Sequence, residues 1–439
     1  MNAPFIERSR SGCALHGALA TLGAIEGVVP IVHSTAGCGI QYQRGVTPFG
    51  GAVPSAAGFG PPLSSSNIGE KHVVFGGSSR LREQLKNSVK VVPGDLYVVV
   101  TGCATEMVGD DIPAMTKEGR EQGFPVIHAN TPGFHGSVHR GYEIAVRALV
   151  EQLTAVPDTP VAPVPGVVNL LGVIPQQDVF WQGLLSGLSQ LLSEIGLTVN
   201  PLLGLGQTVD SWKRVSRADL NLVLSPWGRD AAILLEQRYG TRWLDIGGVP
   251  VGAAATARLL DLLTDGLRLN TGVVDLFRLN EEQVLQAKLA GLAPLYFASG
   301  FQRDFAIIGE LALVSGITEF LVATLGLMPK LAVVTDPLVE EQRAALAAPL
   351  RGILAPFETE PLFTEDAAEI ADLVRASDCE LVIGSAFERS IADELDVPFL
   401  SISFPLADRL VLDRGYVGYA GAIALVEDIG SAILGRRPS

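Results

Sequence analysis

Short apolar runs alternate with longer segments of helical spacing along most of the chain. Residues 1–12 precede this pattern, are polar, and are predicted to form an arm. Strands that alternate with helices predict parallel sheets joined by right-handed crossovers. In the first third, the strand-like runs are VVPIVHS, DLYVVVTGC and FPVIHAN, and the helix-like segments are Ala14–Ile25 and RGYEIAVRALVEQL.

The same alternation then occurs twice more. Residues 154–166 (TAVPDTPVAPVPG) carry four prolines and are predicted to be a linker. The later strand-like runs are VVNLLGVIP, LTVNPLL and DLNLVLSP, followed by RDFAIIGE, KLAVVTDP, ELVIGSA and PFLSISFP. The sequence therefore predicts an α/β fold of three Rossmann-like parallel-sheet domains. Their expected ranges are 1–155, 156–300 and 301–439, and a terminal helix completes the last.

Two irregular segments are expected after the first strand. The Gly-Cys-Gly sequence around Cys38 predicts a turn at the end of that strand. Residues 45–63 are rich in glycine and proline and predict a long loop. Loops of that length are usually functional or contact a partner.

Composition narrows the possible functions. The chain has 439 residues, of which 48% are hydrophobic and only 18% charged, which indicates a surface partly buried in a subunit interface. The net charge of −15 argues against a nucleic-acid partner, because such proteins neutralise phosphates with basic residues. No leader or membrane-length apolar run is expected. Four cysteines fit a reducing compartment, so we predict a cytoplasmic protein.

Most soft metal ligands fall in the first third of the chain. Cys13, Cys38 and Cys103 lie there, together with all six histidines. Cys38 and Cys103 each follow a predicted strand, and ligands of parallel sheets collect at such strand ends. Thiolates are the usual ligands of iron–sulfur clusters, which commonly take four of them. Three thiolates therefore suggest a cluster completed by another chain.

Other interpretations of these residues stay open. Cys13, His16, His33 and Cys38 are the donor types of a zinc site, although long apolar elements flank them and Cys103 would be unused. Free cysteines also serve as small core residues. That is the interpretation we favour for Cys379, which lies at the entrance to a strand.

Polar residues near the cysteines allow two roles. Glu106, Asp110 and Asp111 follow Cys103 closely and could hydrogen-bond near a cluster, but N-terminal capping of the next helix is the simpler interpretation. His33 could likewise tune a cluster, but a hydrogen-bonded core histidine is the simpler role.

The chain resembles the β-type subunits of the nitrogenase component 1 family. The shared features are a cysteine before a small-residue helix, His-x-x-x-Gly-Cys, a serine-rich VFGG segment and Thr-x-Cys-x-x-Glu-x-x-Gly-Asp-Asp. The segments that carry them here are CALHGALATLGAIEGVVPIVHSTAGCG, SSSNIGEKHVVFGGSSRLREQL, VTGCATEMVGDDI and NTPGFHGS. The C-terminal segment ELVIGSAFERSIADELDVPFLSISFPLADRLVLDRGYVGYAGAIALVEDIGSAIL also matches the β type. The resemblance covers both ends of the chain, and it implies a three-domain oxidoreductase subunit.

The resemblance also implies a metal cluster. Cys13, Cys38 and Cys103 match the three β-side ligands of the [8Fe-7S] P-cluster, which α-type and β-type subunits share. The nitrogenase β subunit has a further serine ligand in a Thr-Pro-Ser-Phe segment. This chain reads Thr131-Pro132-Gly133-Phe134, so that oxygen ligand is expected to be absent.

The implied assembly contains other proteins. The chain has no histidine after His139 and no GxxxxGK[ST] loop. The iron–sulfur active-site cofactor is therefore expected in the α-type partner, and ATP hydrolysis in a separate [4Fe-4S] reductase protein. The expected complex is a heterotetramer of two α-type and two β-type chains, without nucleic acid or membrane.

Within the family, the sequence is most similar to the β-type subunit of methylthio-alkane reductase, which cleaves C–S bonds and releases methanethiol. The missing serine and the segments HSTAGCG and 45–63 favour this branch. The alternatives are the β subunit of a dinitrogen-reducing nitrogenase and a subunit of a cofactor-assembly scaffold. A porphyrin-type reductase is disfavoured by its different cysteine spacing. Outside the family, a non-enzymatic ligand-binding α/β protein is the alternative.

Overall fold

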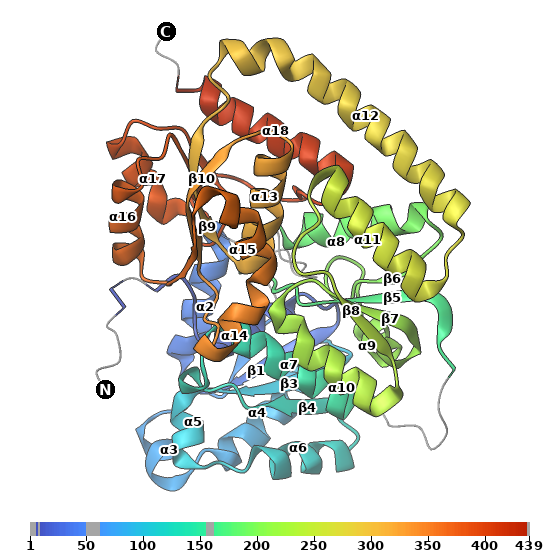
Figure 1. Ribbon diagram of the computed structural model, residues 1–439. Coiled ribbons are helices and arrows are strands. Elements are labelled where there is room, and N and C mark those ends of the chain that lie inside the picture. The colour runs from blue at the N-terminus through green and yellow to red at the C-terminus, as the bar shows by residue number, and fades with distance from the viewer. Residues whose placement is uncertain (1–5, 8, 50–61, 155–161, 437–439) are drawn as a thin grey trace.

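A computed structural model describes residues 6–7, 9–49, 62–154 and 162–436. It contains three sheets, and every strand pair in them is parallel. Figure 1 shows the first sheet at the bottom of the molecule and the third at the top left, with the second between them and to the right. The predicted α/β class with three Rossmann-like sheets is confirmed.

The first sheet has the strand order β2-β1-β3-β4. Its strands β1 and β3 are buried at every position, and they are apolar except for their last residues, His33 and Thr101, as expected for a sheet covered on both faces. Its elements are α1 (Ala14–Gly23), β1 (Val28–His33), α2 (Ala36–Phe49), β2 (Ser64–Ser65), α3 (Glu70–Phe75), α4 (Ser78–Val91), β3 (Leu96–Thr101), α5 (Cys103–Val108), α6 (Ile112–Glu121), β4 (Val126–Ala129), η1 (Gly133–His135) and α7 (Val138–Leu153).

The second sheet has the order β6-β5-β7-β8. On its two central strands, the side-chain amide nitrogen of buried Asn169 donates a hydrogen bond of 2.8 Å to the side-chain oxygen of buried Asn221. Its elements are β5 (Val164–Leu171), α8 (Trp181–Glu194), β6 (Thr198–Asn200), α9 (Val209–Lys213), η2 (Val215–Arg217), β7 (Ala218–Val223), η3 (Pro226–Gly228), α10 (Arg229–Tyr239), β8 (Arg242–Asp245) and α11 (Gly252–Leu267).

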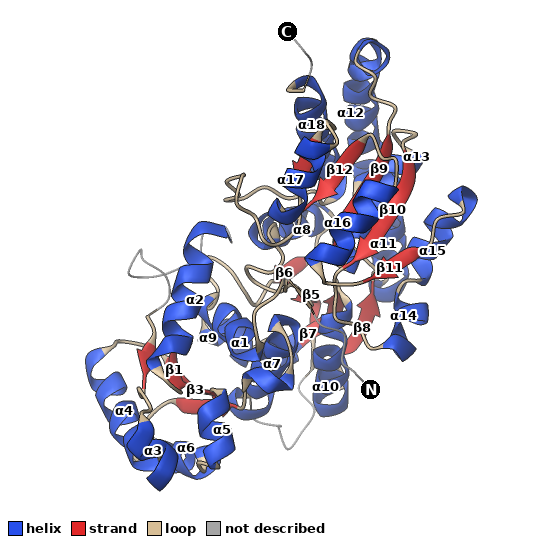
Figure 2. Cartoon of the chain, turned by 90° about the vertical axis from the view of Figure 1, so that its left-hand side faces the viewer, coloured by secondary structure: helices blue, strands red, loops and turns tan. Residues whose placement is uncertain are grey.

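The third sheet has the order β11-β10-β9-β12-β13. The long helix α12 lies next to α18, as Figures 1 and 2 both show. The elements are α12 (Thr271–Ala298), β9 (Asp304–Gly309), α13 (Leu311–Ala323), β10 (Met328–Val334), α14 (Glu340–Leu346), α15 (Ala348–Leu354), η4 (Ala355–Phe357), β11 (Pro361–Phe363), α16 (Ala367–Ala376), β12 (Leu381–Gly384), α17 (Ala386–Glu394), β13 (Phe399–Ser401) and α18 (Gly418–Leu434).

Helices α1 and α7 pack against each other with their backbones in contact. A Cβ atom on Gly17 would lie 1.9 Å from the carbonyl oxygen of Val138, and one on Gly141 would lie 2.0 Å from that of Ala14. Only glycine fits at such distances. This contact fixes the start of α1 beside the segment that leads into α7.

Several local expectations were wrong. Cys38 lies in the first turn of α2 rather than in a loop. The predicted loop at 45–63 is helical as far as Phe49, and its residues 50–61 lie outside the described ones. The close approach of Leu63 leaves little room for a side chain at position 39, because a Cβ atom there would lie 3.0 Å from Leu63 Cδ2. Gly39 therefore permits close packing, whereas the Gly-Cys-Gly sequence predicts a turn.

The predicted linker was also too long. Its last residues, from Val164, belong to β5, whereas residues 155–161 lie outside the described part of the chain. Strands β8 and β11 and helix α12 were not foreseen, because the two strands are short and only partly buried. The domain ranges 1–155, 156–300 and 301–439 stay predictions.

Candidate functional site

The three cysteines of the first third each begin a helix. Cys13 is the N-cap residue of α1, Cys38 lies in the first turn of α2, and Cys103 is the first residue of α5. Helices α2 and α5 follow the neighbouring parallel strands β1 and β3, in which His33 pairs with Thr101. The adjacent strand ends therefore bring Cys38 and Cys103 to the same edge of the sheet, as predicted.

Gly133 lies between two of the thiols. Its backbone N–H donates a hydrogen bond to Cys103 Sγ over 3.1 Å. A methyl group on Gly133 would lie 3.2 Å from Cys103 Sγ and 3.5 Å from Cys13 Sγ. Cys13 is held beside this segment because Ala14 N–H donates to the carbonyl oxygen of Gly136 at 2.8 Å. Cys13 and Cys103 thus lie so close to Gly133 that a side chain at this position would crowd both.

Cys38 lies at the same edge of the sheet, where its thiol contacts the side chain of Ser34. The Ser34 hydroxyl lies 3.4 Å from Cys38 Sγ, and a Cβ on Gly102 would lie 2.1 Å from the same hydroxyl oxygen. The side chain of His16, on α1, hydrogen-bonds to the backbone of Cys38, and burial lowers the pKa of this histidine despite that bond. These contacts connect Cys38 both to Cys103 and to the helix that Cys13 begins.

The geometry argues against the zinc alternative. His33 is completely buried, and its two ring nitrogens already contact Ser66 Oγ at 2.9 Å and Asp110 Oδ2 at 3.1 Å. Among the described residues, no cysteine belongs to a set of three metal-donor atoms within 4.8 Å of one another. Ligands of one zinc ion lie closer than this. The wider spacing of the thiols suits a larger cluster.

The acidic residues after Cys103 are explained by local structure. Asp110 accepts hydrogen bonds from the backbone N–H groups of Gly77 and Ser78 at 2.7 and 3.1 Å, which caps α4. Asp111 caps α6 by accepting from the N–H of Ala114 at 3.0 Å. Glu106 accepts from the Thr101 hydroxyl at 2.6 Å. Asp111 therefore caps the next helix, as predicted, whereas Asp110 caps α4, which precedes it in the sequence.

Cys379 lies far from this edge. It is 6% exposed within the apolar core of the third sheet, and burial raises the pKa of its thiol. Its role as a core residue agrees with the sequence interpretation.

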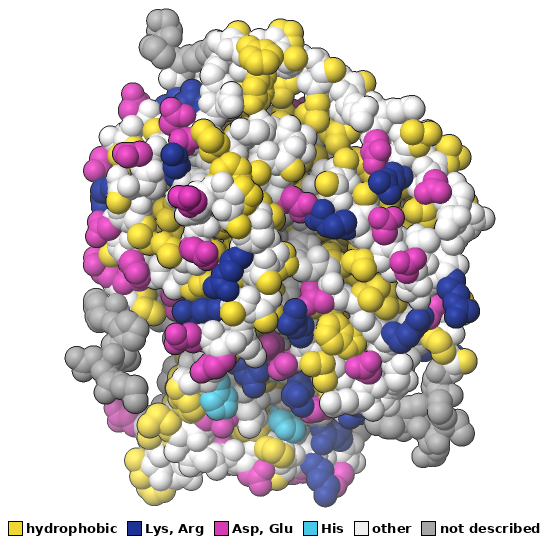
Figure 3. Space-filling view, in the orientation of Figure 1, with side chains coloured by type: hydrophobic (Ala, Val, Ile, Leu, Met, Phe, Trp, Pro, Cys, Tyr) yellow, Lys and Arg dark blue, Asp and Glu magenta, His cyan; other side chains and the backbone are white. Residues whose placement is uncertain are grey.

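Exposed apolar side chains surround the thiol edge, and sequence reasoning missed them. Hydrophobic atoms gather over α3 and α5 at the lower left of Figure 3. The thiols are accessible there, since Cys103 is exposed and Cys13 and Cys38 are half-buried. We name this region the thiol face; its exposed apolar residues are Ile40, Val74, Phe75, Met107 and Phe134, with exposures of 54, 71, 86, 80 and 60%. Large exposed apolar patches mark interaction sites.

No helix in the described part of the chain is long and apolar enough to cross a membrane.

Comparison with known proteins covers almost the whole chain. The sequence profile of the family described as "Nitrogenase component 1 type Oxidoreductase" matches residues 13–434. The nitrogenase molybdenum-iron protein beta chain of Methanococcus maripaludis is 25% identical, over 96% of this chain and 93% of that protein. That of Clostridium pasteurianum is 26% identical, over 96% and 92%. The nitrogenase vanadium-iron protein beta chain of Trichormus variabilis is 25% identical, over 94% and 90%.

A solved structure has the same fold. The structure titled "Nitrogenase Cp1 at pH 6.5" superposes with a TM-score of 0.80, covering 99% of this chain and 95% of its own, at 21% sequence identity.

Proposed function

Because the chain belongs to the nitrogenase component 1 type oxidoreductase family, we propose that it is the β-type subunit of a nitrogenase-like reductase. Relatives named as β chains match it over nearly their full length, which supports the β-type assignment. The observation that carries the proposal is the arrangement of Cys13, Cys38 and Cys103 along one edge of the first sheet.

These three thiolates would hold this chain's half of an [8Fe-7S] P-cluster-type cluster. When bound, such a cluster stores and transfers electrons. The surroundings fit a bulky group at the surface, because Cys103 is exposed and Cys13 and Cys38 are half-buried, and Gly133 adds no side chain that would crowd Cys13 and Cys103. The Gly133 N–H stabilises a thiolate at Cys103, since hydrogen bonds to ligating sulfur tune its charge.

The thiol face would contact an α-type subunit, which supplies the remaining ligands. The combination of accessible thiols and exposed apolar side chains supports this position for the interface. We propose a heterotetramer of two α-type and two β-type chains. A separate ATP-dependent [4Fe-4S] protein would supply electrons, because the sequence has no phosphate-binding GxxxxGK[ST] loop.

We further propose that the complex reduces methylthio-alkanes, with the active-site cofactor in the partner. For dimethyl sulfide, one C–S bond is cleaved with two electrons and two protons, which gives methane and methanethiol. The support from this chain is Gly133, because it stands where the nitrogenase β subunit has its serine ligand and has no oxygen to offer. Dinitrogen reduction is the second candidate, and the similarity to molybdenum and vanadium nitrogenase β chains favours it.

The test uses the complete anaerobic system of both subunits, reductase protein, ATP and a strong reductant. Dimethyl sulfide and dinitrogen are offered in separate vials, and vials without ATP are the control. Methanethiol and methane from the first vial, with little ammonia from the second, would support the proposal. Ammonia without methanethiol would assign the chain to the dinitrogen-reducing enzymes. Neither product, from a complex with its full iron content, would favour an assembly scaffold.

A further inference from the structure

A second group of metal-donor side chains lies remote from the cysteines. His139 is near the start of α7, Glu310 directly follows β9, and Asp336 follows β10. All three are buried, and one donor atom of each lies within 4.8 Å of the others. His139 Nε2 is 3.0 Å from Glu310 Oε2. The carboxyl ends of two neighbouring strands of the third sheet thus meet a helix of the first third, at a place where α/β proteins commonly bind ligands.

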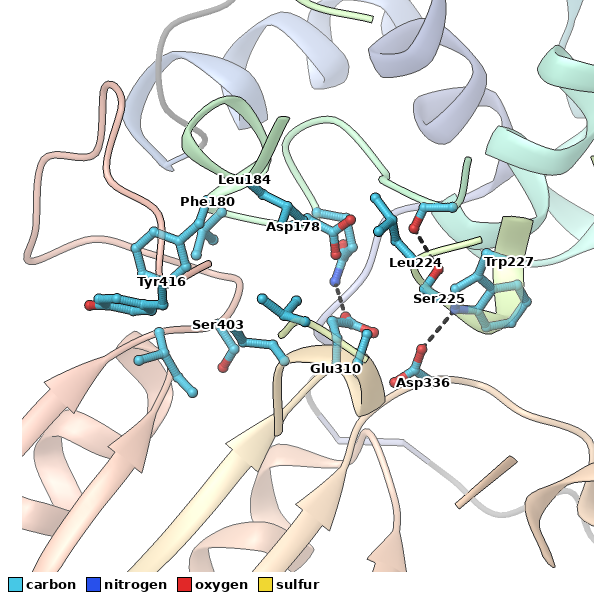
Figure 4. A pocket seen from close by; sticks show the side chains of 17 residues that line it. Asp178, Phe180, Leu184, Leu224, Ser225, Trp227, Glu310, Asp336, Ser403 and Tyr416 are labelled. Atoms are coloured by element: carbon cyan, nitrogen blue, oxygen red, sulfur yellow. Dashed lines mark hydrogen bonds between the residues drawn. The ribbon is translucent and has the colours of Figure 1, made fainter. Parts of the chain in front are cut away.

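The charge of this region is unbalanced. Glu310 and Asp336 line a cavity of about 40 Å³, together with the carboxyl group of Asp178, as Figure 4 shows. None of the described residues that line the cavity is lysine or arginine. One imidazole therefore faces the two buried carboxyl groups of Glu310 and Asp336 and the half-buried carboxyl group of Asp178. A buried carboxylate without a positive partner is costly, and a proton or a metal cation can offset its charge, so this region can accept a cation.

Each donor is fixed by a hydrogen bond from outside the trio. Trp227 Nε1–H donates to Asp336 Oδ1 at 2.7 Å, and Gln177 Nε2–H donates to Glu310 Oε1 at 2.8 Å. His139 Nδ1 lies 3.1 Å from Ser137 Oγ, and this contact leaves Nε2 directed at Glu310. Side chains that bind a metal are characteristically oriented by hydrogen bonds with residues that do not bind the metal themselves. The cavity also has room for water, which would complete the coordination of an ion.

We propose that His139, Glu310 and Asp336 bind one divalent first-row transition-metal ion through an imidazole nitrogen and two carboxylates. This donor set suits Mn²⁺, Fe²⁺ or Zn²⁺, because imidazole and carboxylate ligands are both common for these ions. The ion would replace the His139–Glu310 hydrogen bond and join α7 to the ends of β9 and β10. The site lies within this chain alone, so it does not depend on the function proposed for the thiols.

The test measures binding of Mn²⁺ or Zn²⁺ by the purified anaerobic complex after treatment with a chelator. Equilibrium dialysis should give one ion per β-type chain in addition to the cluster metal. Glu310→Gln and Asp336→Asn should each weaken this binding at least tenfold, whereas Asp265→Asn, an exposed carboxyl, should leave it unchanged. Unchanged binding by both folded site variants would overturn the proposal, as would wild-type complex that binds no additional ion.

A measurement on the wild-type complex keeps the test decisive if the variants fail to fold. Pulsed EPR of the Mn²⁺-loaded complex should show coupling to a directly bound imidazole nitrogen. Bound Mn²⁺ without such coupling would exclude His139 as a ligand and overturn the proposed site.

Discussion

The backbone N–H of Gly133 donates a hydrogen bond to Cys103 Sγ over 3.1 Å, from a position where a side chain would also meet Cys13. A Cβ atom on Gly133 would lie 3.2 Å from both Cys103 Sγ and Cys13 Cβ, which is closer than ordinary contact. The positions of Cys13 and Cys103 therefore depend on the lack of a side chain at residue 133.

Gly133→Ala should perturb the site without removing a proposed ligand. The added methyl group would displace Cys13 and Cys103, so we expect a shifted midpoint potential of the complex or less bound iron. Gly133→Ser adds the same crowding and a hydroxyl oxygen near the thiols. If this oxygen can bind iron, redox titration of the serine variant should differ from that of the alanine variant. Identical titrations of wild type and both variants would contradict the role given to this glycine.

Removal of any one of the three thiols should remove the cluster. We expect Cys13→Ala, Cys38→Ala and Cys103→Ala each to lower the iron and sulfide content of the anaerobically purified complex. Cys379→Ser is the matched control, because this thiol is buried in the core of the third sheet and should not affect iron. Wild-type iron content in the Cys38 and Cys103 variants would refute the assignment.

Introduction of a charge on the thiol face should weaken assembly. Met107, which is 80% exposed and lies one turn after Cys103, would be replaced by aspartate. We expect the dissociation constant for the α-type partner to rise about tenfold or more, since a charge in the centre of an interface is poorly tolerated. Leu205→Asp is the control: Leu205 is 83% exposed but lies near Glu26, before the start of β1 and thus at the opposite edge of the first sheet. Equal weakening by both changes, in sedimentation velocity measurements, would exclude the thiol face as the interface.

The contact between α1 and α7 should depend on glycine. A Cβ atom on Gly17 would lie 1.9 Å from a backbone oxygen, so Gly17→Ala should lower the free energy of unfolding by about 1–3 kcal/mol or more. Gly291→Ala, in the exposed part of α12 where nothing lies within 4 Å, should raise it by up to about 1 kcal/mol through helix propensity. Denaturant unfolding of the two variants should show opposite signs, and destabilisation by both would refute this explanation.

A buried ion pair ties the predicted N-terminal arm to the third sheet. The guanidinium of Arg10 contacts both carboxylate oxygens of Glu388, and the two side chains are 2% and 0% exposed. Arg10→Ala would leave Glu388 buried without its partner, which should lower the free energy of unfolding by roughly 3–5 kcal/mol. Arg375→Ala, which breaks an exposed pair with Glu394, should cost less than about 1 kcal/mol. Similar losses for both variants in denaturant unfolding would contradict this difference.

The sequence by itself determined the parallel α/β class and the position of Cys38 and Cys103 beside strand ends. Both follow from local patterns, because the spacing of apolar residues distinguishes strands from helices and adjacent parallel strands end at the same edge of a sheet. The same local reasoning failed at Cys38 and Gly39, where glycine permits close packing against Leu63 rather than a turn.

Only the tertiary structure decided which distant residues meet. His139 and Glu310 are 171 positions apart, and Arg10 and Glu388 are 378 apart, so no local period connects either pair. The thiol face likewise combines side chains from separate helices whose exposure depends on packing elsewhere. The pattern of apolar residues indicates whether a position is buried. Which side chain that position contacts depends on how helices and strand ends from distant parts of the chain pack together.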